Sequence, residues 1–244
     1  MNTLDAEPLD GLTFLPVALG RAADDISAQI RDAMARGVLK PGIRLPPERS
    51  LAVQFGVSRN TLREALRSLE NSGVLVLRRG AQAGAYIKQS SGKGVATGLL
   101  DMYKLGGLTP EQLTDARILI ETAIVRSACA NCTADDIQAL KDNLKLALAL
   151  DQEQRAQERI EANLDFHRIV ARATHNPLLV TLMNAILEVM QVFVRSIGPY
   201  EASFIFASRK RFIALLEARD EAGAAAEMEK SLRRLQTRYL VKAP

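Results

Sequence analysis

The sequence predicts a mainly α-helical protein in two parts. Three helices and a small β-hairpin come first, and an all-α antiparallel bundle of six to seven helices follows. Strand-like alternation is found over residues 74–88 and not after residue 94, where apolar residues recur at helical spacing. A Ser/Gly-rich run over residues 89–94 separates the two parts. The 244 residues are 48% hydrophobic and 25% charged, which fits a globular protein and excludes intrinsic disorder.

The N-terminal part is expected to contain three short helices and a hairpin. Two prolines open the second helix, because proline suits the first helical turn. Ser58 is a favourable N-cap for the third helix. The predicted helices are Ala22–Arg36, Glu48–Phe55 and Ser58 to about Ser72, and the predicted strands are Val74–Arg79 and Ala85–Lys88.

Composition and helix-start signals set the remaining boundaries. We expect an N-terminal arm over residues 1–20, a first domain over 21–88, a linker over 89–94 and the bundle over 95–244. Thr133 opens a capping-box pattern, and Asn176-Pro177 supplies a cap followed by a first-turn proline. The bundle helices are predicted at residues 95–105, 109–131, 134–151, 155–174, 177–197, 201–219 and 221–242.

Positive charge is concentrated in the first domain. The whole chain carries 32 Lys and Arg against 28 Asp and Glu, a net charge of +4. Residues 40–79 alone hold 8 basic and 3 acidic residues, which is +5. The remainder of the chain is therefore close to neutral, and the basic surface belongs to one 40-residue stretch.

The remaining composition points to a soluble cytoplasmic protein with no membrane partner. The start of the chain has no basic signal region, and polar residues interrupt the most apolar segment, Thr181–Val194. The two cysteines, Cys129 and Cys132, are too few for a disulfide framework, and we expect them to pack at a helix end.

The third predicted helix has two distinct faces. Leu62, Ala65, Leu66 and Leu69 fall on one side, while Arg59, Arg63 and Arg67 fall on another, about 110° away at 100° per residue. Two short helices joined by a tight turn and followed by a hairpin form a winged helix-turn-helix pattern, whose second helix enters a DNA groove. The arginine stripe alone leaves a second interpretation open, a solvated face on an ordinary helix.

A longer motif spans this region: Pro41-Gly42-x-Arg44-Leu45-Pro46-Pro47-Glu48-Arg49, then Phe55-Gly56-Val57-Ser58-Arg59-x-Thr61-x-Arg63-Glu64-Ala65-Leu66. It closely resembles the DNA-binding domain of the GntR family, with a match from about Ala22 to Lys88. The resemblance implies base reading by Arg59 and Arg63. It implies DNA contacts for Arg49, Ser58, Arg59, Asn60, Thr61, Arg63, Arg79 and Gly80.

Three motifs in the bundle resemble the FCD-type effector domain of the FadR-like subfamily. They are Leu113-x-x-Ala116-Arg117-x-x-Ile120-Glu121-x-Ala123, Asn163-x-x-Phe166-His167 continuing to Ala173 and Asn176-Pro177, and Phe212 to Asp220 with Ala224 and Met228. Many members of that type bind a divalent metal through an Asp, a His four residues later and two further His. The matching positions here are Asn163, His167, Arg209 and Ser231.

These substitutions predict a pocket without a metal cofactor. The chain has only two histidines, His167 and His175, so a site with three histidines is impossible. Arg209 would repel a cation, whereas a guanidinium binds a carboxylate through paired charge-assisted hydrogen bonds. A small organic acid is therefore the expected effector, with Arg117, Asn163, His167, Arg209 and Ser231 as its binding residues. Arg117 has an alternative role, an ion pair with Glu121 four residues on.

The resemblances together imply a homodimeric transcription regulator, and not an enzyme. We expect a repressor that binds near-palindromic double-stranded DNA and responds to the organic acid. Three other functions are compatible with the sequence. The first is a metal-dependent regulator with an ion at His167, the second is an architectural DNA binder without an effector, and the third is a bundle enzyme. For such an enzyme the best catalytic pair is Asp165 and His167, but these residues are two positions apart on a helix and do not share a face.

Overall fold

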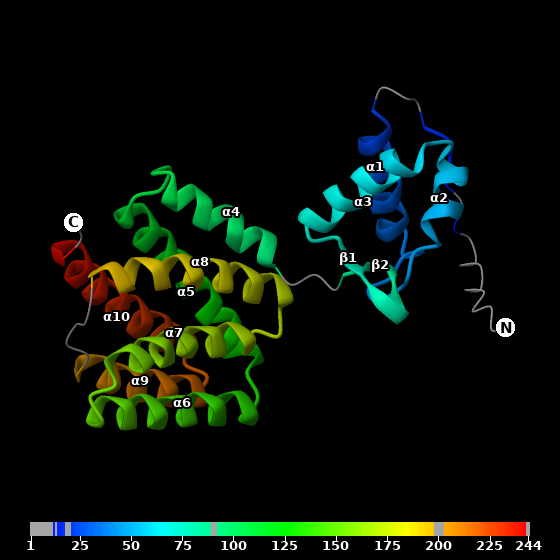
Figure 1. The fold of residues 1–244 in the computed structure, drawn as a ribbon. Helices are drawn as coiled ribbons and strands as arrows, with labels where there is room; N and C mark the ends of the chain where they lie inside the picture. The colour runs from blue at the N-terminus through cyan, green and yellow to red at the C-terminus, as the bar shows by residue number, and fades with distance from the viewer. Residues whose placement is uncertain (1–11, 13, 18–20, 89–91, 198–202, 243–244) are drawn as a thin grey trace. The chain divides into compact units, whose positions relative to one another are not determined.

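The computed structural model describes residues 12, 14–17, 21–88, 92–197 and 203–242 (Figure 1). The chain divides into two compact units, residues 1–94 and 95–244. The described residues are mainly helical with one small antiparallel hairpin, which confirms the predicted fold class. Most of the predicted arm (residues 1–11, 13 and 18–20) and half of the predicted linker (residues 89–91) lie outside the described residues.

The N-terminal unit has three helices followed by a hairpin. They are α1 (Ala22–Ala35), α2 (Glu48–Phe55), α3 (Arg59–Asn71), β1 (Leu75–Arg78) and β2 (Gly84–Ile87), with a 3-10 turn at Gly80–Gln82. The two strands pair so that Leu75 lies opposite Ile87 and Arg78 opposite Gly84. A third short segment pairs with β2, because the Leu45 amide donates to the Ala85 carbonyl at 2.8 Å.

The core of this unit sets the orientation of α3. Ile26 and Ile30 of α1 and Leu62 and Leu66 of α3 are buried against one another. Gly56 ends α2 at φ +67°, a left-handed conformation that glycine adopts without a steric penalty, and so permits the tight turn into α3. The apolar face of α3 is therefore fixed inward and its arginine face outward.

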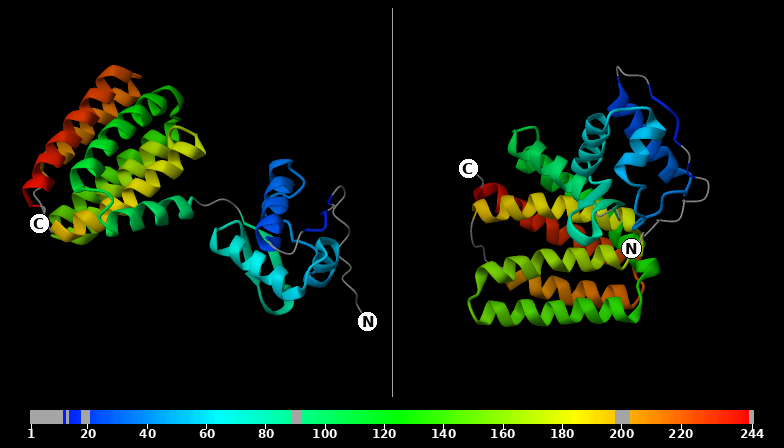
Figure 2. Two further views of the ribbon diagram at one scale, coloured as in Figure 1. Left: turned by 90° about the horizontal axis from the view of Figure 1, so that it is seen from above. Right: turned by 45° about the vertical axis from the view of Figure 1, so that its right-hand side comes forward.

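Helices are the only regular secondary structure in the described residues of the C-terminal unit, and most of them run side by side in both views of Figure 2. Helix α10 packs on α5 and α9, α6 packs on α7 and α9, and α7 packs on α8. The helices are α4 (Lys93–Lys104), α5 (Pro110–Asn131), α6 (Ala134–Gln152), α7 (Ala156–Arg172), α8 (Pro177–Ile197), α9 (Ser203–Glu217) and α10 (Glu221–Lys242).

The predicted helix ends are correct to within about two residues. Helix α4 begins at Lys93, inside the stretch predicted as linker. Helix α7 ends at Arg172, two residues early, because His175 takes φ +52° and turns the chain. Thr133 caps α6 through a capping box with Asp136, as its sequence pattern predicts. The Asn176 side chain likewise accepts the Leu178 amide at the start of α8.

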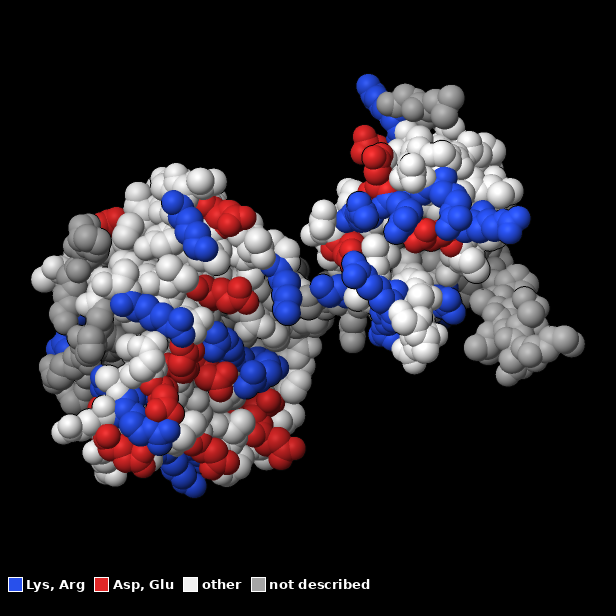
Figure 3. Space-filling model, viewed as in Figure 1, with Lys and Arg blue, Asp and Glu red and all other residues white. Residues whose placement is uncertain are grey.

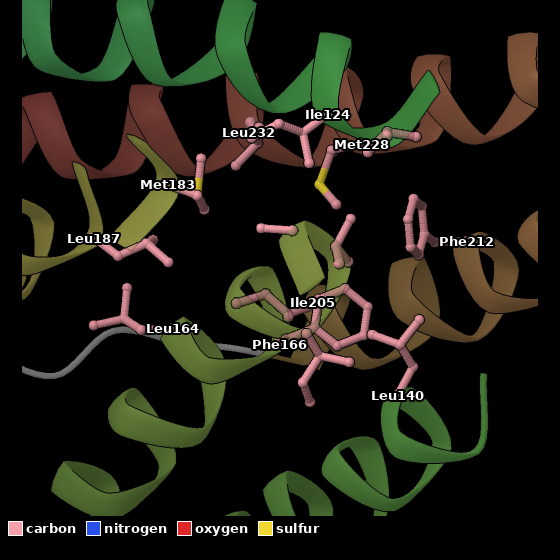
Figure 4. Close-up of a cluster of buried hydrophobic side chains, with 14 of the residues drawn as sticks. Ile124, Leu140, Leu164, Phe166, Met183, Leu187, Ile205, Phe212, Met228 and Leu232 are labelled. Carbon is pink, nitrogen blue, oxygen red and sulfur yellow. The ribbon is translucent and has the colours of Figure 1, made fainter. Parts of the chain in front are cut away.

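The bundle core is built from aromatic and flexible apolar side chains drawn from most of its helices. Figure 4 shows Phe166 of α7, Ile205 and Phe212 of α9, and Met228 of α10 facing one another. The rings of Phe166 and Phe212 meet edge to face with centroids 5.8 Å apart. This cluster forms the apolar wall of the cavity described below.

Helix α8 is long and apolar enough, by length and composition, to cross a membrane. Although Asn184, Glu188 and Gln191 interrupt this helix, its mean hydropathy is high enough for a membrane span. The helix is nevertheless part of the core, since Met183, Leu187, Met190 and Val194 are buried among the other helices. A core helix of a globular bundle has the same composition, so this one helix is weak evidence for a membrane span.

Candidate DNA-reading surface and effector cavity

Helix α3 presents its arginines to solvent. Arg59, Arg63 and Arg67 are exposed, while Leu62, Ala65, Leu66 and Leu69 are buried beneath them. Ser58 caps the helix as predicted, because its hydroxyl accepts the Thr61 amide at 3.2 Å. The Ser58 and Thr61 hydroxyls are also 2.9 Å apart, which fixes both at the N-terminus of α3.

The other residues predicted to contact DNA lie at the surface of the same unit. Arg49 is exposed in the first turn of α2, and Arg79 and Gly80 are exposed at the tip of the hairpin. Figure 3 shows basic side chains gathered in a band across this unit, interrupted by two acidic spots. One acidic neighbour is Glu48, whose Oε2 lies 3.7 Å from Nε of Arg63. The sequence does not indicate this pair, because Glu48 and Arg63 lie on different helices.

All five predicted effector residues line one cavity of about 30 Å³ in the C-terminal unit. They come from four helices: Arg117 from α5, Asn163 and His167 from α7, Arg209 from α9 and Ser231 from α10. Arg117, Asn163, His167 and Arg209 are buried, and Ser231 is half-buried. The apolar lining consists of Leu164, Phe166, Ile205, Phe212, Met228 and Leu235.

Arg209 is buried, with 5% of its surface exposed. Its Nη1 donates to Oδ1 of Asn163 at 2.9 Å, and its Nη2 donates to the Asn163 carbonyl at 2.8 Å. The guanidinium also lies 4.3 Å above the Phe166 ring centroid, a cation–π contact. Neutral oxygens therefore satisfy part of this buried cation, where the sequence had suggested an anion.

The side-chain amide of Asn163 has its oxygen hydrogen-bonded and its nitrogen without a partner among the described residues. Its Oδ1 must be the acceptor for Arg209, since a guanidinium only donates, and this fixes the amide orientation. Its Nδ2 is buried and has no hydrogen-bond partner among the described residues. A buried donor left without an acceptor costs about 1–3 kcal/mol. The cavity thus holds an amide donor beside a guanidinium.

Arg117 forms the ion pair that the sequence offered as its alternative role, and it lines the cavity as well. Its Nε donates to Oε1 of Glu121 at 2.6 Å, and both side chains are buried. Burial opposes ionisation of Glu121, but Arg117 and His167 outweigh it and lower the pKa of that carboxyl to about 2. Glu121 is therefore a permanent anion at neutral pH.

His167 packs against the same carboxylate. Its Nδ1 lies 2.5 Å from Oε2 of Glu121. Burial, only partly offset by Glu121, lowers the pKa of His167 to about 4, so the imidazole is neutral at pH 7. Nδ1 nevertheless has no hydrogen bond of acceptable geometry among the described residues, so the contact is a close approach of the ring to the carboxylate. The sequence missed this contact, because the two residues lie on different helices with no fixed spacing between them.

These groups do not fit a divalent metal. No cluster of three or more His, Cys, Asp or Glu side chains that could hold an ion occurs in the described part of the chain. The Asn163 oxygen accepts from a cation already, and Arg209 stands where a ligand would be needed. His167 is the one imidazole at the cavity among the lining residues described, and a single imidazole makes a weak zinc site.

The other residues of interest lie away from the cavity. Cys129 and Cys132 are buried and free, and burial raises the pKa of both thiols, in keeping with the expected packing role. Arg219 donates to the Cys129 carbonyl at 2.6 Å, a contact that the sequence did not suggest. His175 lies at the surface, with Nε2 2.9 Å from Oδ2 of Asp136.

Two family models match the chain. Residues 22–87 match "Bacterial regulatory proteins, gntR family", and residues 112–234 match "FCD domain". The chain belongs to the GntR family. It is a transcription regulator with a GntR helix-turn-helix and an FCD domain, as the sequence resemblance implied, and its relatives are transcription regulators rather than enzymes.

Among its GntR-family relatives are two regulators from Escherichia coli (strain K12). The Uxu operon transcriptional regulator is 35% identical over 162 residues, which cover 66% of this chain and 62% of the relative. The putative L-lactate dehydrogenase operon regulatory protein is 31% identical over 179 residues, which cover 72% and 67%. A solved structure, "Streptococcus agalactiae GntR", aligns with a TM-score of 0.64 at 20% identity, over 88% of this chain and 99% of that one.

Proposed function

We propose that this GntR-family regulator is a cytoplasmic homodimeric repressor whose operator affinity is controlled by a small carboxylate bound in the bundle cavity. The observation that supports this most directly is the buried Asn163 amide beside Arg209. Its Nδ2 donor lacks an acceptor among the described residues, and an effector oxygen would supply one. Such an acceptor removes the desolvation cost only in the bound state, which favours binding.

A carboxylate suits the remaining groups around the cavity. Arg209 and Arg117 are buried cations at its wall, and charge-assisted hydrogen bonds to a carboxylate are about twice as strong as neutral ones. The Ser231 hydroxyl and the neutral His167 ring offer donors or acceptors for a second polar group on the effector. No carboxylate side chain is present among the described lining residues.

The size of the cavity restricts the effector. About 30 Å³ suits two or three water molecules, since each needs roughly 10–15 Å³. A ligand larger than a few atoms requires movement of the apolar wall. Met228 is suited to that movement because its unbranched side chain has three rotatable bonds. Widening of the bundle is then the change that passes to the DNA-binding domain.

On DNA, α3 enters the major groove, with Arg59 and Arg63 reading base edges. The other contacts come from Arg49, Ser58, Asn60 and Thr61 to the backbone and from Arg79 and Gly80 at the tip of the hairpin. Two copies related by a two-fold axis place their α3 helices about 34–36 Å apart, one helical turn of a near-palindromic operator. Effector and DNA then weaken each other's binding by the same factor.

Thermal unfolding of the full chain with small carboxylates, and with the matching uncharged amides, tests the effector site. A carboxylate at 100 times its dissociation constant stabilises the protein by about 2.7 kcal/mol. We expect Arg209→Gln to abolish that stabilisation and Arg211→Gln to preserve it, because Arg211 is exposed on the same helix and pairs with Glu227. Ser231→Ala provides a second test at a half-buried position, should Arg209→Gln fail to fold.

Two results would count against the proposal. If no carboxylate stabilises the protein, the architectural interpretation is favoured. If zinc or nickel stabilises it and His167→Gln removes the effect, the regulator is metal-dependent with an ion at His167.

A further inference from the structure

Between α3 and the hairpin, the N-terminal unit has an open hollow of about 280 Å³. Four arginines line it: Arg63 and Arg67 from α3, and Arg78 and Arg79 from the end of β1. Two carboxylates complete its charged lining, Glu48 and Glu70. Four cations against two anions make the described lining electropositive.

The two carboxylates already serve other groups. Glu70 Oε1 accepts the Leu77 amide at 2.9 Å and so ties α3 to β1. Glu48 lies beside Arg63 at 3.7 Å. The hydrogen bond from Leu77 holds the two walls of the hollow at a fixed separation. Arg67 and Arg78 thus face one space from opposite walls.

Arg78 is oriented by the hairpin itself. Its guanidinium lies 4.5 Å from the centroid of the Tyr86 ring, and its Nη1 donates to Oε1 of Gln82 at 3.2 Å. The Tyr86 hydroxyl in turn donates to the Gln82 carbonyl at 3.2 Å. A guanidinium stacked on a ring keeps its other edge available for the oxygens of a carboxylate or a phosphate. The place of Arg78 at the hairpin edge predicts a contact with an adjacent groove or the DNA backbone, and Arg67 belongs to the arginine stripe of α3, but the family resemblance implied a contact for neither residue.

One sugar–phosphate backbone separates the two grooves of a duplex. A protein with a helix in the major groove and a hairpin at the neighbouring groove must therefore straddle that backbone. We propose that the hollow between α3 and the hairpin seats a phosphate of this backbone, with Arg67 and Arg78 contacting it from opposite sides. This inference rests on the placement of α3 in the major groove, proposed above.

The salt dependence of DNA binding tests whether Arg67 and Arg78 contact a phosphate. The probes are a duplex selected from a random-sequence pool by the full-length protein, and a shuffled duplex of the same composition. Arg67→Ala and Arg78→Ala should weaken binding to both duplexes, since a phosphate contact carries no sequence information. Each variant should lower the slope of log affinity against log salt by about 1. The ratio of wild-type affinity to variant affinity then shrinks about 3.5-fold between 50 and 200 mM salt.

Three further variants complete the experiment. Arg36→Ala changes an exposed arginine directly after α1 that pairs with Asp32, and it should leave the slope unchanged. Arg67→Lys keeps the charge and should keep the slope. Arg59→Ala tests the position of α3, because it should weaken the selected duplex far more than the shuffled one.

The outcomes separate the two proposals. Unchanged slopes for Arg67→Ala and Arg78→Ala, with a selective loss for Arg59→Ala, would overturn the phosphate seat alone. A loss confined to the selected duplex in either variant would also overturn it. An Arg59→Ala variant that binds like the wild type would overturn the placement of α3 itself.

Discussion

Burial of His167 predicts that the bundle loses stability as the pH falls from 7 to 5. The pKa of His167 is about 4 in the folded protein, against an ordinary value of 6.5, because burial disfavours its charged form. Below pH 6.5 the unfolded chain takes up a proton at this residue, and the folded protein does so only near pH 4. The contribution of His167 to the free energy of unfolding therefore falls across that window, and below pH 4 the full contribution is lost.

The size of the effect follows from the two pKa values. Linkage gives a loss of about 2 kcal/mol between pH 7 and pH 5 from His167 alone. Glu121 adds little in this range, since the unfolded chain takes up its proton mainly below the ordinary pKa of 4.5, and the folded protein only near pH 2. Three charged groups face His167 and influence its pKa: Glu121 and Arg117 of α5, and Arg209 of α9.

Urea unfolding followed by far-ultraviolet circular dichroism measures this loss at pH 7, 6 and 5. His167→Gln should remove about 2 kcal/mol of the pH dependence. His175→Gln is the matched control, since His175 is the chain's other histidine and lies at the surface, so it should keep the full dependence. Equal losses of stability in His167→Gln and the wild type between pH 7 and 5 would show that His167 is not the source of the pH dependence.

Three further predictions concern single side chains. Glu121→Gln should destabilise the folded chain by about 3 kcal/mol at pH 7, because it leaves Arg117 beside a neutral amide in a buried site; urea unfolding measures this, and an unchanged midpoint contradicts it. Arg59→Ala and Arg63→Ala should each lower affinity for the selected duplex by about 1–3 kcal/mol, measured by fluorescence anisotropy, and a wild-type affinity would contradict base reading. Ser58→Ala should cost about 1 kcal/mol of stability through the lost cap on α3, whereas Ser58→Gly should cost only a few tenths; equal losses in thermal unfolding would contradict a capping role.

The sequence predicted the elements of the fold well because their signals are local. Ser58, Thr133 and Asn176 mark helix starts through bonds to residues two or three positions away, and the structure contains each of these bonds. The alternation of apolar residues and arginines likewise fixed the two faces of α3. Local spacing was less informative where a backbone conformation decided the boundary, as at His175.

The candidate site was predicted as a set of positions, not as a set of contacts. The motifs led to five residues that line one cavity, although they come from four helices. Spacing did give the pair of Arg117 and Glu121, which lie four residues apart on one helix. The contacts of Arg209 with Asn163 cross 46 residues and depend on how α7 packs against α9, which no local pattern encodes.

The same limit explains what the sequence missed on the DNA-reading surface. Arg67 was visible as part of a stripe, but its position across a hollow from Arg78 depends on how the hairpin folds back onto α3. The bond between Glu70 and the Leu77 amide, seven residues apart across a turn, fixes that geometry. Hairpin placement of this kind arises from tertiary packing rather than from residue spacing.

Control of DNA binding by a carboxylate in the cavity is the proposal on which the regulatory function of this protein depends. The most direct test measures affinity for the selected duplex with and without the carboxylate that stabilises the protein, in the wild type and in Arg209→Gln. We predict that the carboxylate weakens wild-type DNA binding and leaves that of Arg209→Gln unchanged, with both proteins binding DNA equally in its absence. An Arg209→Gln variant that releases DNA at the same carboxylate concentration as the wild type would contradict the claim.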